Sequence, residues 1–129
     1  MASTLTRKPT SSELEILHIL WERGPSTVRE VHEALHAKRP IGYTSVLKLM
    51  QIMTAKGTVR RNEEQRAHVY EAVQPEEKTK RDLALDVIQR VFDGSASALM
   101  MHALAGRKAS KEEIEEMRRL LNEHERKHR

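Results

Sequence analysis

The sequence predicts a mainly α-helical protein, and three observations support this fold class. Aromatic residues make up only 3% of the 129 residues, so a core must be built from Leu, Val, Ile, Met and Ala, which suit helices better than a β-sandwich. Apolar residues recur at helical spacing behind residues that cap helices. Cysteine is absent, which excludes disulfides and thiolate metal sites.

Two helices are expected near the N-terminus. The first begins at the possible caps Thr10, Ser11 and Ser12, with Glu13 or Glu15 placed to complete a capping box, and ends at Gly24-Pro25. The second begins after Ser26 or Thr27 and ends before Pro40. Their apolar stripes consist of Leu14, Leu17, Leu20, Trp21, Val28, Val31 and Leu35.

A third helix and a hairpin complete the predicted N-terminal domain. The helix runs from about Tyr43 to Lys56 and stops at Gly57. Residues 58–73 then form two short extended runs on either side of the polar stretch 62–65, which indicates a β-hairpin. Three helices followed by a basic hairpin is the order of a winged helix-turn-helix, so we expect such a domain over residues 1–74.

Residues 75–129 are expected to form a helical homodimerisation region. Helices are predicted from Pro75-Glu76 to near Gly94, over 97–105, and after a capping box made by Ser110 and Glu113. Each is apolar on one face only, so alone they would bury too little apolar surface, and a second copy would supply it. The alternative is that this tail folds back on its own N-terminal domain. The predicted dimerisation residues are Leu83, Val87, Ile88, Val91, Leu99, Leu104, Ile114, Met117 and Leu121.

Basic residues are concentrated in the middle of the chain. The formal net charge is +4, and the segment 38–66 holds seven Lys and Arg against two Glu. Such a patch attracts nucleic acid phosphates. The longest apolar run, 96–105, is too short to span a membrane and the N-terminus lacks a signal-peptide pattern, so we expect a cytoplasmic protein with no membrane insertion of its own.

The third helix has the face that a DNA-reading helix needs. Thr44, Ser45, Lys48, Gln51, Ile52 and Ala55 fall opposite its apolar stripe on a helical wheel. Short hydrogen-bonding side chains let the backbone approach base edges, and a longer cation reaches a guanine or a phosphate. Double-stranded DNA is therefore the expected partner. The predicted phosphate contacts are Arg7, Lys8, Thr10, Ser11, Tyr43, Lys56, Arg60, Arg61, Arg66 and His68.

One motif points to a different chemistry. The stretch "VHEALH" places His32, Glu33 and His36 in the H-E-x-x-H pattern of zinc peptidases. The two histidines flank the apolar stripe instead of lining a cleft, and no second motif selects a third ligand. We therefore predict no enzyme activity, no metal and no cofactor, and keep a zinc peptidase as an alternative.

Several segments together resemble the penicillinase-repressor family of the BlaI, MecI and CopY type. They are "SSELEILHILWERGPSTVREVHEAL", "GYTSVLKLMQIMTAKGTVRR", "RAHVYEAV" and "DGSASALMMHALAGRKASKEEIEEMRRLLNE", and the resemblance extends from about Leu5 to Glu123. It implies a homodimeric winged-helix repressor on a palindromic operator, typically with TACA and TGTA half-sites. It also implies base contacts by Thr44, Ser45, Leu47 and Lys48.

The resemblance further implies derepression by proteolysis, triggered by a membrane-bound metalloprotease sensor. The cut would fall between the first two dimerisation helices, where this chain has the candidate cleavage residues Ser95, Ala96 and Ser97 but not the Asn-Phe bond of the best-known members. Without cysteine, the metal sensing of the copper-responsive members is excluded. A ligand-responsive winged-helix regulator and a protein-binding winged-helix module stay open as alternatives.

Overall fold

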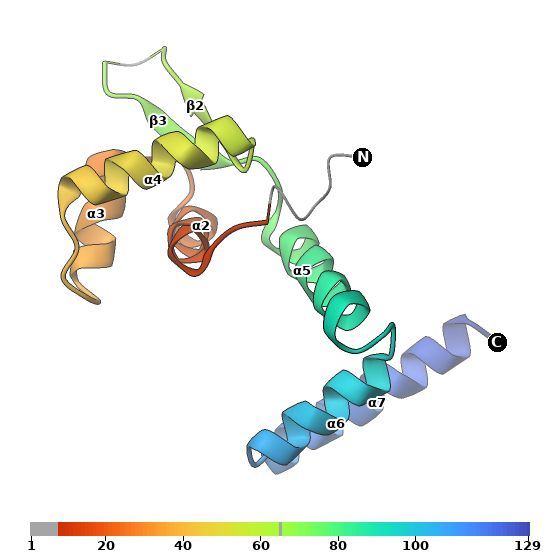
Figure 1. The fold of residues 1–129 in the computed structure, drawn as a ribbon. Coiled ribbons are helices and arrows are strands. Elements are labelled where there is room, and N and C mark those ends of the chain that lie inside the picture. The colour runs from red at the N-terminus through yellow and green to blue at the C-terminus, as the bar shows by residue number, and fades with distance from the viewer. Residues whose placement is uncertain (1–7, 65) are drawn as a thin grey trace. The chain divides into compact units, whose positions relative to one another are not determined.

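The computed structural model describes residues 8–64 and 66–129 and divides the chain into two compact units, one ending at Ala84 and the other beginning at Leu85 (Figure 1). The division falls inside the helix α5 (Glu76–Val91). The domain boundary predicted after residue 74 lies just before this helix and stays a prediction.

The first unit is a winged helix. Its elements before α5 are α2 (Ser11–Arg23), β1 (Ser26–Thr27), α3 (Val28–His36), α4 (Tyr43–Lys56), β2 (Val59–Asn62) and β3 (Val69–Ala72). The three strands form an antiparallel sheet in the order β1-β3-β2, with Ser26 opposite Tyr70 and Arg61 also opposite Tyr70. The predicted hairpin is therefore present, and the short β1 widens it into the small sheet of the fold.

Local signals explain where these helices begin and end. Thr10 and Glu13 form a reciprocal capping box at α2, and Thr27 with Glu30 forms another at α3. Gly57 ends α4 with φ at 85°, a left-handed conformation that glycine adopts without steric cost. Of the possible caps of the first helix, the structure uses Thr10.

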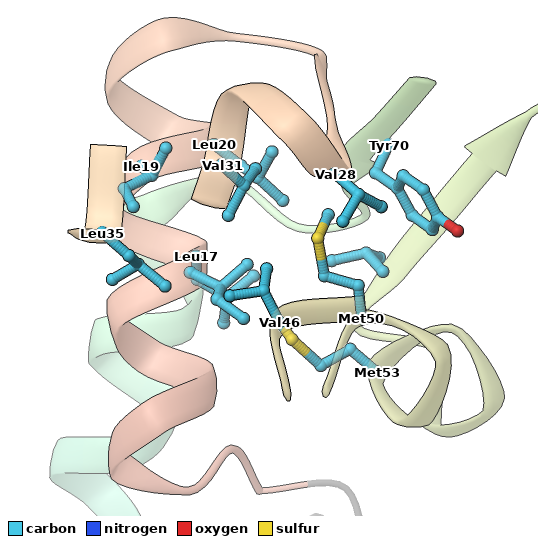
Figure 2. Close-up of a cluster of buried hydrophobic side chains, with 12 residues drawn as sticks. Leu17, Ile19, Leu20, Val28, Val31, Leu35, Val46, Met50, Met53 and Tyr70 are labelled. Carbon is cyan, nitrogen blue, oxygen red and sulfur yellow. The ribbon is translucent and has the colours of Figure 1, made fainter. Parts of the chain in front are cut away.

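The core of the first unit lies between α2, α3, α4 and the sheet, where their apolar side chains point toward one another (Figure 2). The burial of such side chains makes the largest favourable contribution to the free energy of folding of the domain. The Trp21 indole nitrogen also donates a hydrogen bond of 3.0 Å to the Gln74 carbonyl oxygen, which ties α2 to the segment before α5. The core residues are Ile16, Leu17, Ile19, Leu20, Val28, Val31, Leu35, Val46, Met50, Met53, Val59 and Tyr70.

The second unit contains the end of α5, α6 (Ala96–Gly106) and α7 (Lys111–Lys127), and none of its residues is buried. Ser95 caps α6 and Ser110 caps α7. The predicted capping box of α7 is only half present, because the Glu113 carboxylate pairs with Arg107. No helix in the described part of the chain is long and apolar enough to cross a membrane.

Candidate nucleic-acid interface

Helix α4 has one buried face and one exposed face. Val46, Met50 and Met53 are fully buried and anchor the helix in the core. The opposite face is solvent-exposed, and its side chains are those expected from the helical wheel: Thr44, Ser45, Lys48, Gln51, Ile52 and Ala55. Among the described residues, no hydrogen bond or ion pair engages the Lys48 side chain, so its ammonium is available to a ligand. A recognition helix needs such a rigidly anchored, polar outer face.

Leu47 lies at the edge of this face. Its side chain is half-buried and packs against the core cluster, whereas Thr44, Ser45 and Lys48 are exposed. The exposed Ile52 is a large apolar side chain on the outer face, with 39% of its surface accessible. Ile52 is therefore better placed than Leu47 to make an apolar contact with a thymine methyl group.

Two arginines of the hairpin are paired with carboxylates. The Arg60 guanidinium lies 2.7 Å from Glu71, and that of Arg61 lies 2.6 Å from Glu63. The hydrogen bond from Arg61 lowers the pKa of the Glu63 carboxyl below its ordinary value. A phosphate would have to compete with these carboxylates, whereas Arg66 is exposed and has no ion pair within the described segments.

Lys56 and Thr10 both have a structural partner in Glu13: the Thr10 capping box was predicted from the sequence, whereas the Lys56 ion pair was not. The Lys56 ammonium lies 3.0 Å from a carboxylate oxygen of Glu13, which is 2% exposed. The same oxygen accepts a hydrogen bond from the Thr10 backbone N–H, and the Thr10 hydroxyl accepts one from the Glu13 N–H. Ser11 is exposed at the first position of α2, and Arg7 lies outside the described residues.

Two sets of contacts hold the turn between α3 and α4. The Arg39 guanidinium donates to both carboxylate oxygens of Glu15 on α2, and this hydrogen bond lowers the pKa of the Glu15 carboxyl. The rings of His32 and His36 lie against the Ile41 carbonyl oxygen, and His32 also contacts the ring of Tyr43. Tyr43 is 47% exposed at the start of α4.

The H-E-x-x-H residues do not form a peptidase site in this arrangement. Glu33 is exposed and pairs with Arg29 at 3.5 Å, one turn away on α3. The described residues contain no cluster of three or more His, Cys, Asp or Glu side chains suited to a metal ion. The motif is a helix-surface pattern whose histidines contact the backbone of the following turn.

None of the predicted dimerisation residues is buried within the chain. Leu83, Val87, Ile88, Leu99 and Met117 are half-buried, and the rest are exposed: Val91, Leu104, Ile114 and Leu121. The structure adds exposed apolar side chains of the second unit that the prediction omitted, namely Leu85, Met100, Met101 and Leu120.

In the candidate cleavage segment, Ser95 caps α6 while Ala96 and Ser97 are exposed in its first turn.

A shallow hollow of about 340 Å³ lies beside Trp21 in the first unit. Its charged lining residue, Glu71, is already paired with Arg60. The hollow therefore presents no convergent set of polar groups that would orient a small effector. It is lined by Leu20, Trp21, Gly24, Pro25, Glu71, Ala72, Val73, Gln74 and Pro75.

The chain is similar to characterised regulators along nearly its whole length. It is 34% identical to the transcriptional regulator BlaI of Mycobacterium tuberculosis over 118 residues, which cover 90% of this chain and 84% of the relative. It is 23% identical to the methicillin resistance regulatory protein MecI of Mammaliicoccus sciuri over 117 residues, covering 91% and 95% of the two chains. It is 22% identical to the penicillinase repressor of Bacillus licheniformis over 115 residues, covering 89% and 90%.

The family model described as "Penicillinase repressor" matches residues 9–123, which include all of the winged helix and most of the second unit. The relatives are named regulators and repressors, which confirms the prediction that the chain is not an enzyme. The fold, the exposed outer face of α4 and the extent of these matches agree: the chain belongs to the penicillinase-repressor family.

Proposed function

We propose that this chain is a transcriptional repressor that binds a palindromic DNA operator as a homodimer, with α4 of each subunit in a major groove. The observation that carries the proposal is the outer face of α4. Thr44, Ser45 and Lys48 are exposed there, on a helix whose other face is locked in the core by Val46 and Met50. Hydrogen-bonding side chains on a rigid helix read base edges.

The hairpin supports this orientation. Arg60, Arg61 and Arg66 lie on or beside its strands, so the basic wing would meet the sugar-phosphate backbone next to the groove. Arg66 would contact a phosphate directly, whereas Arg60 and Arg61 would exchange their carboxylate partners for phosphates.

The second unit supports the homodimer. Its helices expose large apolar side chains and bury none, and a second copy would cover them. In a twofold dimer, the two copies of α4 would read half-sites about one helical turn apart or a multiple of it.

Derepression by proteolysis is the third part of the proposal. A cut beside Ser95, Ala96 or Ser97 would separate α6 and α7 from the winged helix, and the exposed Ala96 and Ser97 leave that segment open to a protease. A membrane-bound metalloprotease sensor would trigger the cut in the cytoplasm. Mass spectrometry of the chain from induced cells tests this step, and an intact chain after induction would contradict it.

DNA binding is tested by band-shift titration of operator and random duplexes at two salt concentrations. We expect Lys48→Ala to weaken operator binding by about 1–3 kcal/mol, because it removes a contact that discriminates among bases.

Arg61→Ala should weaken binding to every duplex to a similar extent and flatten the dependence on salt, because it removes a phosphate contact. The proposal fails if the wild-type protein shows no preference among duplexes at physiological salt. Equal effects of the two variants on both duplexes would contradict the role of Lys48.

A further inference from the structure

The two histidines of the H-E-x-x-H motif lie against one backbone oxygen. His32 Nε2 is 2.8 Å from the Ile41 carbonyl oxygen, and His36 Nδ1 is 3.3 Å from the same atom. The ring centroids are 5.4 Å apart. Both imidazoles therefore reach from α3 to the residue that lies two positions before α4.

The chemistry of the acceptor decides where the ring hydrogens are. A carbonyl oxygen has two lone pairs and accepts hydrogen bonds but never donates them. Both ring nitrogens that face it must therefore carry a hydrogen, which places one on Nε2 of His32 and one on Nδ1 of His36. In their neutral forms, the two histidines thus hold opposite tautomers one helical turn apart.

The oxygen they hold belongs to the turn that sets the start of α4. Gly42, the N-cap of α4, makes no side-chain capping bond, whereas α2 and α3 both begin with a full capping box. Ile41 packs its side chain against the core while the histidines hold its carbonyl oxygen. The His32 ring also meets the Tyr43 ring edge-on at 5.8 Å, at the first residue of α4.

We propose that His32 and His36 are positioning residues for the DNA-reading helix: their two N–H groups clamp the Ile41 carbonyl and so fix where α4 begins. This inference rests on the proposed function, in which α4 reads the operator. It gives the H-E-x-x-H motif of this chain a role in DNA recognition, and the role of His32 is the larger because its hydrogen bond is shorter and half-buried.

Specific and non-specific binding respond differently to such a clamp. Thr44 and Ser45 lie in the first turn of α4, three and four residues after the clamped Ile41. Hydrogen bonds to base edges weaken steeply with small displacements, whereas attraction to phosphates acts over longer distances. Releasing the clamp should therefore reduce operator affinity while leaving affinity for random DNA at low salt nearly unchanged.

The matched variants use amide side chains as histidine substitutes. The amide nitrogen of Gln lies near the position of a histidine Nε2, and that of Asn lies near Nδ1. His32→Gln and His36→Asn therefore keep the donor, whereas His32→Leu and His36→Leu remove it. His18→Leu is the control, because His18 is exposed on α2 and contacts Trp21 instead of the turn.

We expect His32→Leu to lower operator affinity about tenfold, as the loss of one half-buried hydrogen bond implies. His36→Leu should lower it about threefold, because its bond is longer and exposed. His32→Gln and His36→Asn should recover most of each loss, and random-duplex affinity should stay within about twofold throughout. If Leu and Gln at position 32 reduce operator and random binding to the same extent, the clamp has no positioning role.

A DNA-free measurement separates this inference from the proposed function. Nitrogen-15 NMR of the histidine rings in the wild-type protein should show the hydrogen on Nε2 for His32 and on Nδ1 for His36 at a pH where both are neutral. The same tautomer in both rings would overturn the clamp, whatever the protein binds. If the two rings hold opposite tautomers but the protein shows no preference among duplexes, the result supports the clamp and contradicts only the repressor proposal.

Discussion

The two units of this chain use their apolar residues in opposite ways. Twelve apolar side chains among the described residues of the first unit form a buried cluster shared by α2, α3, α4 and the sheet. In residues 85–129 no side chain is buried, and large apolar side chains are exposed on all three helices of the second unit. One unit thus has a buried core of its own, and we expect the exposed apolar faces of the other to form a subunit interface.

This difference indicates what each unit needs in order to fold. A helix that is apolar on one face gains most of its stability from the surface that covers this face. In the first unit that surface belongs to the same chain. For the second unit we expect it to come from another copy, so its stability should depend on protein concentration while that of the first should not.

Of the changes that test this comparison, Met50→Ala should have the largest effect on stability. Met50 is fully buried in the core, and its truncation should lower the free energy of unfolding of the first unit by about 2–5 kcal/mol. Urea unfolding followed by Trp21 fluorescence at several protein concentrations checks this. A midpoint that shifts with concentration would contradict the independence of the first unit.

Leu121→Lys tests the second unit. Leu121 is 57% exposed on α7, and a charge in an apolar dimer interface should raise the dimer dissociation constant about 30-fold. Sedimentation equilibrium measures this constant, and circular dichroism checks that the helices persist. Val73→Lys is the matched control, because Val73 is also exposed, at 40%, but lies in the first unit. Equal effects of both changes on the dimer would contradict the division of roles.

Much of the fold was predictable because its signals are local. Thr10 and Ser110 precede helices in the manner of caps, and Gly57 ends α4 where its left-handed conformation is needed. The two-residue strand β1 was not predicted, since Ser26 and Thr27 show no alternation and are recognisable as a strand only through their pairing with β3.

The candidate site was likewise predictable where it depends on the helical period, and not where it depends on contacts between distant residues. The helical wheel separates the exposed Lys48 from the buried Met50, because both positions follow from the helical period alone. The partner of Lys56 lies 43 residues away at Glu13, and the hydrogen-bond acceptor of His32 is a backbone atom. No local pattern encodes such contacts, so they appear only when the fold brings the elements together.

Lys56→Met tests one of these long-range contacts inside the first unit. It leaves the Glu13 carboxylate nearly buried without its cation, which should lower the free energy of unfolding by about 1–2 kcal/mol. Urea unfolding measures the loss. The double variant Glu13→Gln with Lys56→Met should recover part of it, and a double variant less stable than Lys56→Met would contradict the pairing.

The smallest expected effect is a pH dependence that differs between the units. Glu15 and Glu116 both have a lowered pKa, because each carboxylate accepts hydrogen bonds from an arginine, Arg39 and Arg119 respectively. The first pair joins α2 to the turn before α4, whereas the second lies within one turn of α7. Glu15→Gln should therefore lower the urea midpoint of the first unit, and Glu116→Gln should not.

The sign of the pH effect follows from the direction of the shift. A carboxyl whose pKa is lower in the folded state stabilises that state above its ordinary value of 4.5, and the contribution disappears as the pH falls through the lowered value. The gap in urea midpoint between wild type and Glu15→Gln should thus be constant near pH 7 and close below pH 4.5. A gap that persists in acid would mean that the glutamate acts through packing, and the same gap for Glu116→Gln would mean that the two units unfold together.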